Sequence, residues 1–131
     1  MAETTEPIVL NYWYNLRGHV QSLFYLLEYL KVPYTFNTVD GQEEYKEFKK
    51  NLKEGGARFP NLPSISHKGR YISEARAIAH YICKVAGRPE LQAKPENIIE
   101  FFQLEGIISD TYWDISWSAY VAKDFEELKK I

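Results

Sequence analysis

The hydrophobic pattern of the chain changes period several times, and each change marks an expected element. Residues 8–14 are β-branched and aromatic, which is typical of a buried strand. From Val20 the apolar positions recur at helical spacing until Pro33, and residues 34–39 then return to a strand-like composition. The first part of the chain therefore predicts a strand, a helix and a second strand.

After the second strand, the pattern predicts a short helix, a hairpin and a closing helix. A charged segment follows in which apolar side chains lie three and four residues apart, at Tyr45, Phe48 and Leu52. Two short apolar stretches then flank the turn-like residues 67–70, which favours an antiparallel hairpin. Ser73 is in position to cap the next helix, and Gly87 with Pro89 marks its end.

This order of elements predicts an α/β domain with a mixed sheet, covered by helices, of the thioredoxin-like architecture. We expect residues 1–88 to form that domain and residues 89–131 to form a partial helical domain. Its long helix begins near Ile98, and Asp124 with Glu127 resembles a capping box for one more short helix.

Composition and charge exclude several classes of partner and location. Sixteen basic and 18 acidic residues give a net charge of −2, which argues against nucleic acid as a partner. No apolar run approaches the ~20 residues that a membrane span needs. Residues 1–6 are acidic and lack the pattern of a secretory or transit peptide, so we expect the protein to be cytoplasmic.

The chain shows no sign of metal or disulfide chemistry. Cys83 is the single cysteine and falls on the apolar side of a predicted helix, so we expect a buried structural thiol. The three histidines do not have metal-ligand spacing; they are His19, His67 and His80. Aromatic residues make up 15% of the chain, which indicates a large core or a partner face.

Two segments carry a resemblance to a known family. Residues 59–63 are Phe-Pro-Asn-Leu-Pro, and residues 72–78, starting eleven positions after Asn61, are Ile-Ser-Glu-Ala-Arg-Ala-Ile. With Arg17-Gly18 and Leu104-Glu105, which also agree in order and spacing, they resemble the glutathione transferases, most closely the mu and sigma classes. The resemblance runs through nearly the whole chain. It implies a thioredoxin-like glutathione-recognition domain followed by the start of an all-α domain.

The resemblance also implies a site for glutathione. Asn61, Leu62 and Pro63 would form a cis-proline turn in which the Leu62 backbone pairs with the peptide backbone of glutathione, the alternative being a proline that only enters a strand. The helix that starts at Glu74 would receive the γ-glutamyl carboxylate. Ala75 stands where the family usually has serine. Without that hydroxyl we expect binding to be weaker by about tenfold to a hundredfold, or absent.

The resemblance implies that the catalytic group is a tyrosine hydroxyl. This hydroxyl favours the thiolate of glutathione and so lowers the pKa of the thiol from about 8.5. The family tyrosine lies five residues before the glycine of Arg-Gly, and counting back from Gly18 gives Trp13, which has no hydroxyl. Tyr12 fits if one residue is inserted, and Tyr14 is the other neighbour. We predict Tyr12, with aromatic packing as the alternative.

Four further residues are candidates for contacts with glutathione on the same resemblance. Trp13 directly follows the predicted tyrosine in the sequence, and Arg17 comes shortly after it. Lys53, one residue out of register, is a candidate for the glycyl carboxylate, or else a solvated lysine. Asp110 matches an acid that reaches the glutathione of the partner subunit, or else is a surface aspartate.

These residues lead to two hypotheses for the function. The first is a divergent glutathione transferase-like protein that conjugates glutathione to small electrophiles, with glutathione as substrate and no metal. The alternative is a non-catalytic structural or interaction subunit of a larger assembly, which Ala75, the shifted tyrosine and the short helical domain favour. A protein partner, as a homodimer or a larger assembly, is expected because the apolar residues of the long helix cannot all face the first domain. They are Ile98, Phe102, Ile108, Trp113 and Trp117.

Overall fold

A computed structural model of the protein describes residues 6–122 and 124–129. The chain divides into two compact units, the first ending at Leu91 and the second beginning at Gln92. The domain boundary expected after residue 88 stays a prediction.

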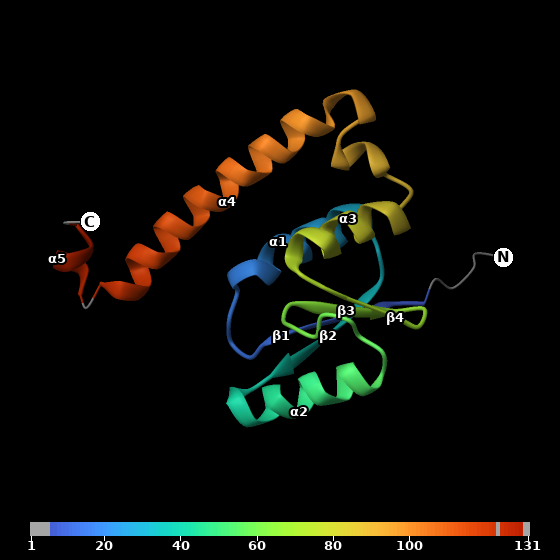
Figure 1. Ribbon diagram of the computed structural model, residues 1–131, viewed down its shortest axis with the longest axis horizontal. Coiled ribbons are helices and arrows are strands. Elements are labelled where there is room, and N and C mark those ends of the chain that lie inside the picture. The colour runs from blue at the N-terminus through green and yellow to red at the C-terminus, as the bar shows by residue number, and fades with distance from the viewer. Residues whose placement is uncertain (1–5, 123, 130–131) are drawn as a thin grey trace. The chain divides into compact units, whose positions relative to one another are not determined.

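The first unit is built on a four-stranded sheet with the strand order β2-β1-β3-β4 (Figure 1). β1 (Ile8–Trp13) pairs in parallel with β2 (Tyr34–Val39). On its other side β1 pairs antiparallel with β3 (Ser64–His67), which pairs antiparallel with β4 (Arg70–Ser73). The predicted α/β class with a mixed, thioredoxin-like sheet is confirmed.

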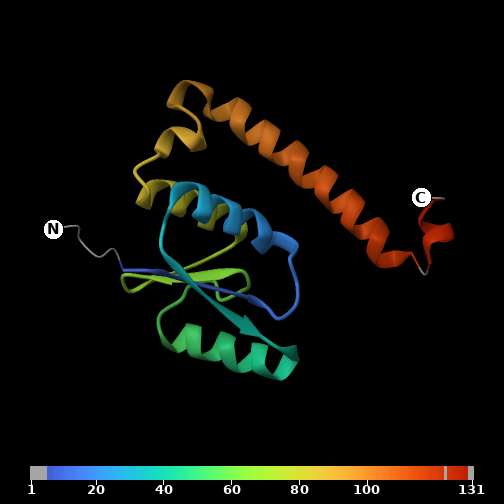
Figure 2. The same cartoon turned by 180° about the vertical axis from the view of Figure 1, so that it is seen from behind.

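Helices cover both faces of this sheet. α1 (Gln21–Leu30) and α3 (Ala75–Val85) lie on one face, and α2 (Gly41–Glu54) lies on the other (Figures 1 and 2). α1 supplies the crossover that a parallel β1–β2 pair requires, whereas the two-residue turn at Lys68 and Gly69 is enough for the antiparallel β3–β4 pair. The different spacing of the elements along the chain thus produces the mixed sheet.

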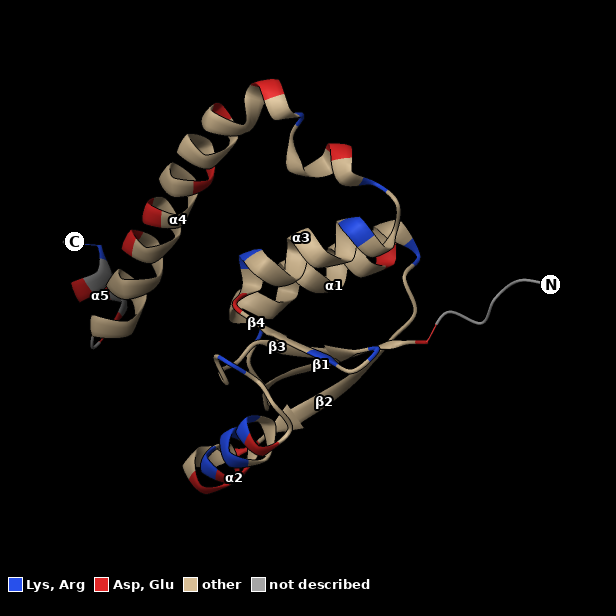
Figure 3. Ribbon diagram, turned by 45° about the vertical axis from the view of Figure 1, so that its right-hand side comes forward, with Lys and Arg blue, Asp and Glu red and all other residues tan. Residues whose placement is uncertain are grey.

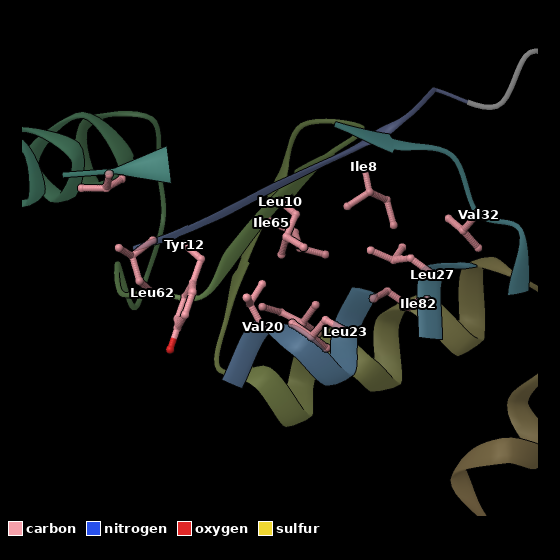
Figure 4. Packing of buried hydrophobic residues seen from close by; sticks show 12 residues of the cluster. Ile8, Leu10, Tyr12, Val20, Leu23, Leu27, Val32, Leu62, Ile65 and Ile82 are labelled. Atoms are coloured by element: carbon pink, nitrogen blue, oxygen red, sulfur yellow. The ribbon is translucent and has the colours of Figure 1, made fainter. Parts of the chain in front are cut away.

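The hydrophobic core fills the space between the sheet and the pair α1 and α3 (Figure 4). Ile8, Leu10 and Tyr12 alternate along β1, so their side chains share one face of the sheet. They pack with fully buried residues of β3, α1 and α3, namely Ile65, Leu23, Leu27, Ile78 and Ile82. Cys83 is also buried, as predicted.

The face of the sheet toward α2 has a different, polar chemistry. Asn11 is buried there, and its side-chain nitrogen donates to the Ser64 carbonyl and hydroxyl oxygens, each at 3.4 Å. Asn37 in turn donates to the Asn11 side-chain oxygen at 3.4 Å. Buried polar groups are tolerated only when they are hydrogen-bonded in this way. The face under α2 thus combines these polar pairs with the buried apolar side chains of Val39 and Leu52.

α2 is the amphipathic helix that its spacing predicts. Its buried residue is Leu52, while Tyr45 and Phe48 are partly buried against the core. Most of the other residues of α2 are lysines and glutamates (Figure 3). α2 therefore makes a smaller apolar contact with the sheet than α1 and α3 do.

The prediction that Ser73 caps the following helix was wrong. Ser73 is the last residue of β4, and its hydroxyl donates to the Phe59 carbonyl of the preceding loop. The residue in the N-cap position of α3 is Glu74, with φ of 73°, and no side chain caps the helix. The capping pattern failed because the strand continues one residue further than the spacing indicated.

The second unit consists mainly of α4 (Ile98–Val121), followed by the short α5 (Phe125–Leu128). No residue of α4 is buried, and exposed apolar side chains are spread around its whole circumference. The Glu127 N–H donates to the Asp124 carboxylate at 2.8 Å, as the capping pattern predicts. Among residues 6–122 and 124–129, no helix combines the length and apolarity that crossing a bilayer requires.

Candidate functional site

Tyr12 is placed by the strand alternation of β1. Its ring is buried in the core, with a relative exposure of 6%, beside Val20 and Leu62 (Figure 4). Its hydroxyl oxygen accepts a hydrogen bond from the His19 backbone N–H at 3.3 Å, at the turn that leads into α1. The hydroxyl thus reaches the end of the core nearest the first helix.

Gly18 makes this position of the hydroxyl possible. It has φ of 26°, and a Cβ atom built on it would lie 2.5 Å from the Tyr12 hydroxyl oxygen. Any side chain at this position would meet the hydroxyl, because 2.5 Å is far inside van der Waals contact. The glycine of the Arg-Gly pair therefore has a steric role next to the predicted tyrosine.

The backbone leaves β1 after Trp13 and turns before Arg17. β1 keeps its register with β2 as far as Trp13 and Val39. Beyond it Tyr14 is 59% exposed and Asn15 adopts a left-handed conformation with φ of 56°, which asparagine tolerates well. Of the two neighbouring tyrosines, Tyr12 is the one that reaches the start of the first helix. Its catalytic role stays a prediction.

A chain of contacts joins β1, α2, the loop before β3 and the start of α3. The Trp13 ring lies against Tyr45, with ring centroids 4.6 Å apart. The Tyr45 hydroxyl donates to the Asn61 side-chain oxygen at 2.9 Å, and the Asn61 side-chain nitrogen donates to the Glu74 carboxylate at 2.9 Å. Three of the predicted site residues, Trp13, Asn61 and Glu74, are thereby brought together.

The segment after Asn61 has the geometry that the resemblance implies. The Leu62–Pro63 peptide bond is cis, as predicted. Leu62 is 8% exposed and its side chain belongs to the same core cluster as Tyr12. The backbone of this segment is thus held next to the predicted tyrosine.

The start of α3 offers backbone donors beside Glu74. The Ile78 N–H donates to the Glu74 carbonyl at 3.0 Å, which is the first hydrogen bond of the helix. The Ala75 N–H precedes that bond, and N–H groups in the first turn of a helix have no partner within the helix. Such groups attract anions, which the partial positive charge of the helix N-terminus also favours.

Comparison with known proteins decides the family. The model of the glutathione S-transferase N-terminal domain matches residues 9–84, more than half of the chain. The chain belongs to the glutathione S-transferase family. It is 33% identical over 121 residues to the class-mu 26 kDa isozyme of Schistosoma japonicum, and it covers 53% of that protein while 92% of this chain is aligned. The chain thus spans about half the length of this relative.

Solved structures show the same fold. The structure of NaGST-2 superposes with a TM-score of 0.72 at 18% identity, covering 95% of this chain and 58% of the other. Monomeric Na-GST-3, a glutathione S-transferase from Necator americanus, superposes with a TM-score of 0.65 at 19% identity, covering 95% and 59%. At these identities the likeness establishes the fold alone.

Three predicted glutathione S-transferase site residues take no part in the hydrogen bonds and ring contacts described above. Arg17 is exposed in the turn before α1. Lys53 lies in the last turn of α2, roughly 12 Å of helix beyond Tyr45. Asp110 belongs to the second unit. Their roles stay predictions.

Sequence reasoning missed Tyr45 and Lys49. It treated Tyr45 as a packing residue, whereas the structure gives its hydroxyl a hydrogen bond to Asn61. The Lys49 ammonium lies 5.4 Å from the centroid of the Tyr45 ring, a cation–π contact. Their four-residue spacing on α2 is the one signal that links them in the sequence.

Proposed function

We propose that this glutathione S-transferase family member binds glutathione and conjugates its sulfur to small electrophiles in the cytoplasm. The observation that supports this best is the Tyr12 hydroxyl, held at the start of the first helix with Leu62 beside the ring. The Asn61-Leu62-Pro63 segment and the start of α3 supply the remaining contacts expected of such a site.

The proposed chemistry uses the hydroxyl to favour a thiolate. A free thiol has a pKa of about 8.5, and a hydrogen bond from the Tyr12 hydroxyl to the sulfur would stabilise the charged form. The thiol proton leaves to solvent. The thiolate then attacks the electrophilic carbon and forms the S–C bond, and the leaving group of that carbon, such as the halide of an aryl halide, departs with the electron pair of the broken bond. Tyr12 itself keeps its proton throughout.

The proposed contacts for the γ-glutamyl residue divide its two charges between neighbouring groups. Its carboxylate would lie at the start of α3, where the Ala75 N–H donates. Its ammonium group would face the Glu74 carboxylate, which Asn61 holds at 2.9 Å. The Leu62 backbone would pair with the peptide backbone of glutathione, as in strand addition.

Ala75→Ser is expected to strengthen glutathione binding by about tenfold to a hundredfold, because a hydroxyl that donates to a carboxylate forms a charge-assisted hydrogen bond. Isothermal titration of the purified protein with glutathione measures the change. Ala77→Ser, the same substitution two positions further along α3, is the matched control and should leave the affinity unchanged. Tight binding by the unmodified protein that Ala75→Ser does not alter would show that the carboxylate lies elsewhere.

A second candidate function, as a subunit of a larger assembly, is favoured by α4. Helices that are apolar on all sides are normally buried. The apolar side chains that α4 exposes include Ile99, Phe102, Leu104, Ile108 and Trp117. We propose that another protein chain covers them, in a homodimer or a larger assembly, since stable interfaces bury roughly 1,200 to 2,000 Å².

Light scattering on the purified protein tests this proposal and should give a mass well above that of a single chain. The tryptophans of α4, Trp113 and Trp117, report on the same surface. A well-folded monomer at micromolar concentration, with these tryptophans shielded from a soluble quencher, would contradict the proposal.

A further inference from the structure

We propose that Tyr45 is a positioning residue of the glutathione site, which fixes the Asn61 amide so that the Glu74 carboxylate is held to receive the amino group of glutathione. The inference rests on the proposed function. It goes beyond the family resemblance, because Tyr45 is outside the segments that carry that resemblance.

The direction of the hydrogen bonds follows from what each group is able to donate. An ionised carboxylate only accepts, so the Asn61 group that faces Glu74 at 2.9 Å must be its NH₂. This leaves the Asn61 oxygen facing Tyr45 at 2.9 Å, and the Tyr45 hydroxyl must therefore donate. Tyr45 and Glu74 never touch, yet each determines the orientation of the amide between them.

Packing holds the Tyr45 hydroxyl in place. The ring is partly buried against the core cluster and lies against Trp13, with centroids 4.6 Å apart. Lys49 stands 5.4 Å from the centroid of the same ring. A donor held in this way loses little side-chain entropy on forming its bond, so it orients Asn61 better than a solvated hydroxyl would.

The consequence for recognition is specific to one part of the ligand. Glu74 is exposed apart from its bond to Asn61, so without Asn61 its side chain would sample several rotamers. Holding it at the start of α3 places one negative charge where the amino group of the γ-glutamyl residue would lie. The positioning should therefore matter for glutathione and not for an analogue that lacks this amino group.

Tyr45→Phe removes the donor and keeps the ring. Titration calorimetry is expected to show about three- to tenfold weaker binding of glutathione, with unchanged binding of deaminated glutathione, since one hydrogen bond is lost. Tyr34→Phe is the matched control, because it also removes a tyrosine donor. The Tyr34 hydroxyl donates to the Glu28 carboxylate at a distance of 2.8 Å, and this hydrogen bond is not part of the proposed site. Equal weakening of both peptides, or none, would overturn the positioning role.

A second measurement needs no ligand. Asn61→Asp places a carboxylate opposite Glu74 and is expected to lower the midpoint of thermal unfolding, and adding Glu74→Gln should restore most of the loss by supplying a donor. Failure of this rescue would overturn the hydrogen-bond direction on which the proposal depends. The rescue could succeed while the unmodified protein binds neither glutathione nor deaminated glutathione. In that case the proposed function and the recognition role of Tyr45 are both wrong, and only the hydrogen-bond network is confirmed.

Discussion

Tyr12→Phe is expected to abolish the conjugation of glutathione to a small aryl halide, with a loss of about a hundredfold or more at neutral pH. Removing one preorganised donor to a developing or stabilised anion typically costs about 10²–10³ in rate. The ring is buried and the hydroxyl oxygen lies 3.3 Å from the His19 nitrogen, so phenylalanine should keep the packing of the ring and remove the proposed catalytic donor.

The pH dependence separates this role from a structural one. In the variant the glutathione thiol should titrate near its ordinary pKa of about 8.5, so the rate difference from the unmodified protein should shrink as the pH rises toward about 9. Tyr14→Phe is the control, since Tyr14 is 59% exposed beyond the end of β1. Full activity in the Tyr12 variant and loss in the Tyr14 variant would transfer the role to Tyr14.

Gly18→Ala is expected to lower the conjugation rate by about tenfold or more and to destabilise the fold by about 1–3 kcal/mol. The added Cβ atom would lie 2.5 Å from the Tyr12 hydroxyl oxygen, so either the ring or the turn must move. Movement of either one displaces the hydroxyl from the position where the sulfur is proposed to bind. Steady-state rates and denaturant unfolding measure the two effects.

The chain offers a control that separates contact from backbone strain. Gly69 also has a positive φ, of 72°, but a Cβ atom built on it meets nothing within 4 Å. Gly69→Ala should therefore destabilise the fold through backbone strain and leave the conjugation rate unchanged. Adding Tyr12→Phe to Gly18→Ala should recover part of the lost stability, because it removes the atom that clashes. No recovery would mean that the backbone angle alone explains the effect of Gly18→Ala.

The order of elements could be predicted from the sequence because each change in hydrophobic period marks a change of structure. The periods of β1 and α1 differ clearly, and the fold class followed from that alternation. The Ser73 cap was wrong because capping depends on where a strand ends, which propensity fixes only to within a residue or two.

The candidate site was less predictable than the fold. The segment at Leu62–Pro63 was found because the family motif is contiguous in the sequence. The contacts of Tyr45 with Asn61 and of Asn61 with Glu74 span 16 and 13 residues, and no local period reports them. Side-chain hydrogen bonds between separate elements depend on packing, which appears only once the chain has folded.

The packing of α2 on the sheet affects the fraction of molecules in which the proposed site is fully formed. α2 buries Leu52 and packs Tyr45 and Phe48 against the core, while most of its remaining surface is charged and solvated. We therefore expect α2 to open locally at a lower free-energy cost than α1 or α3. Tyr45 travels with α2, so each such local opening separates it from Asn61. Only the closed fraction would then recognise the amino group, and the apparent affinity would fall in proportion to that fraction. Because glutathione would bind the closed form better, its binding would in turn stabilise the packing of α2 against the sheet.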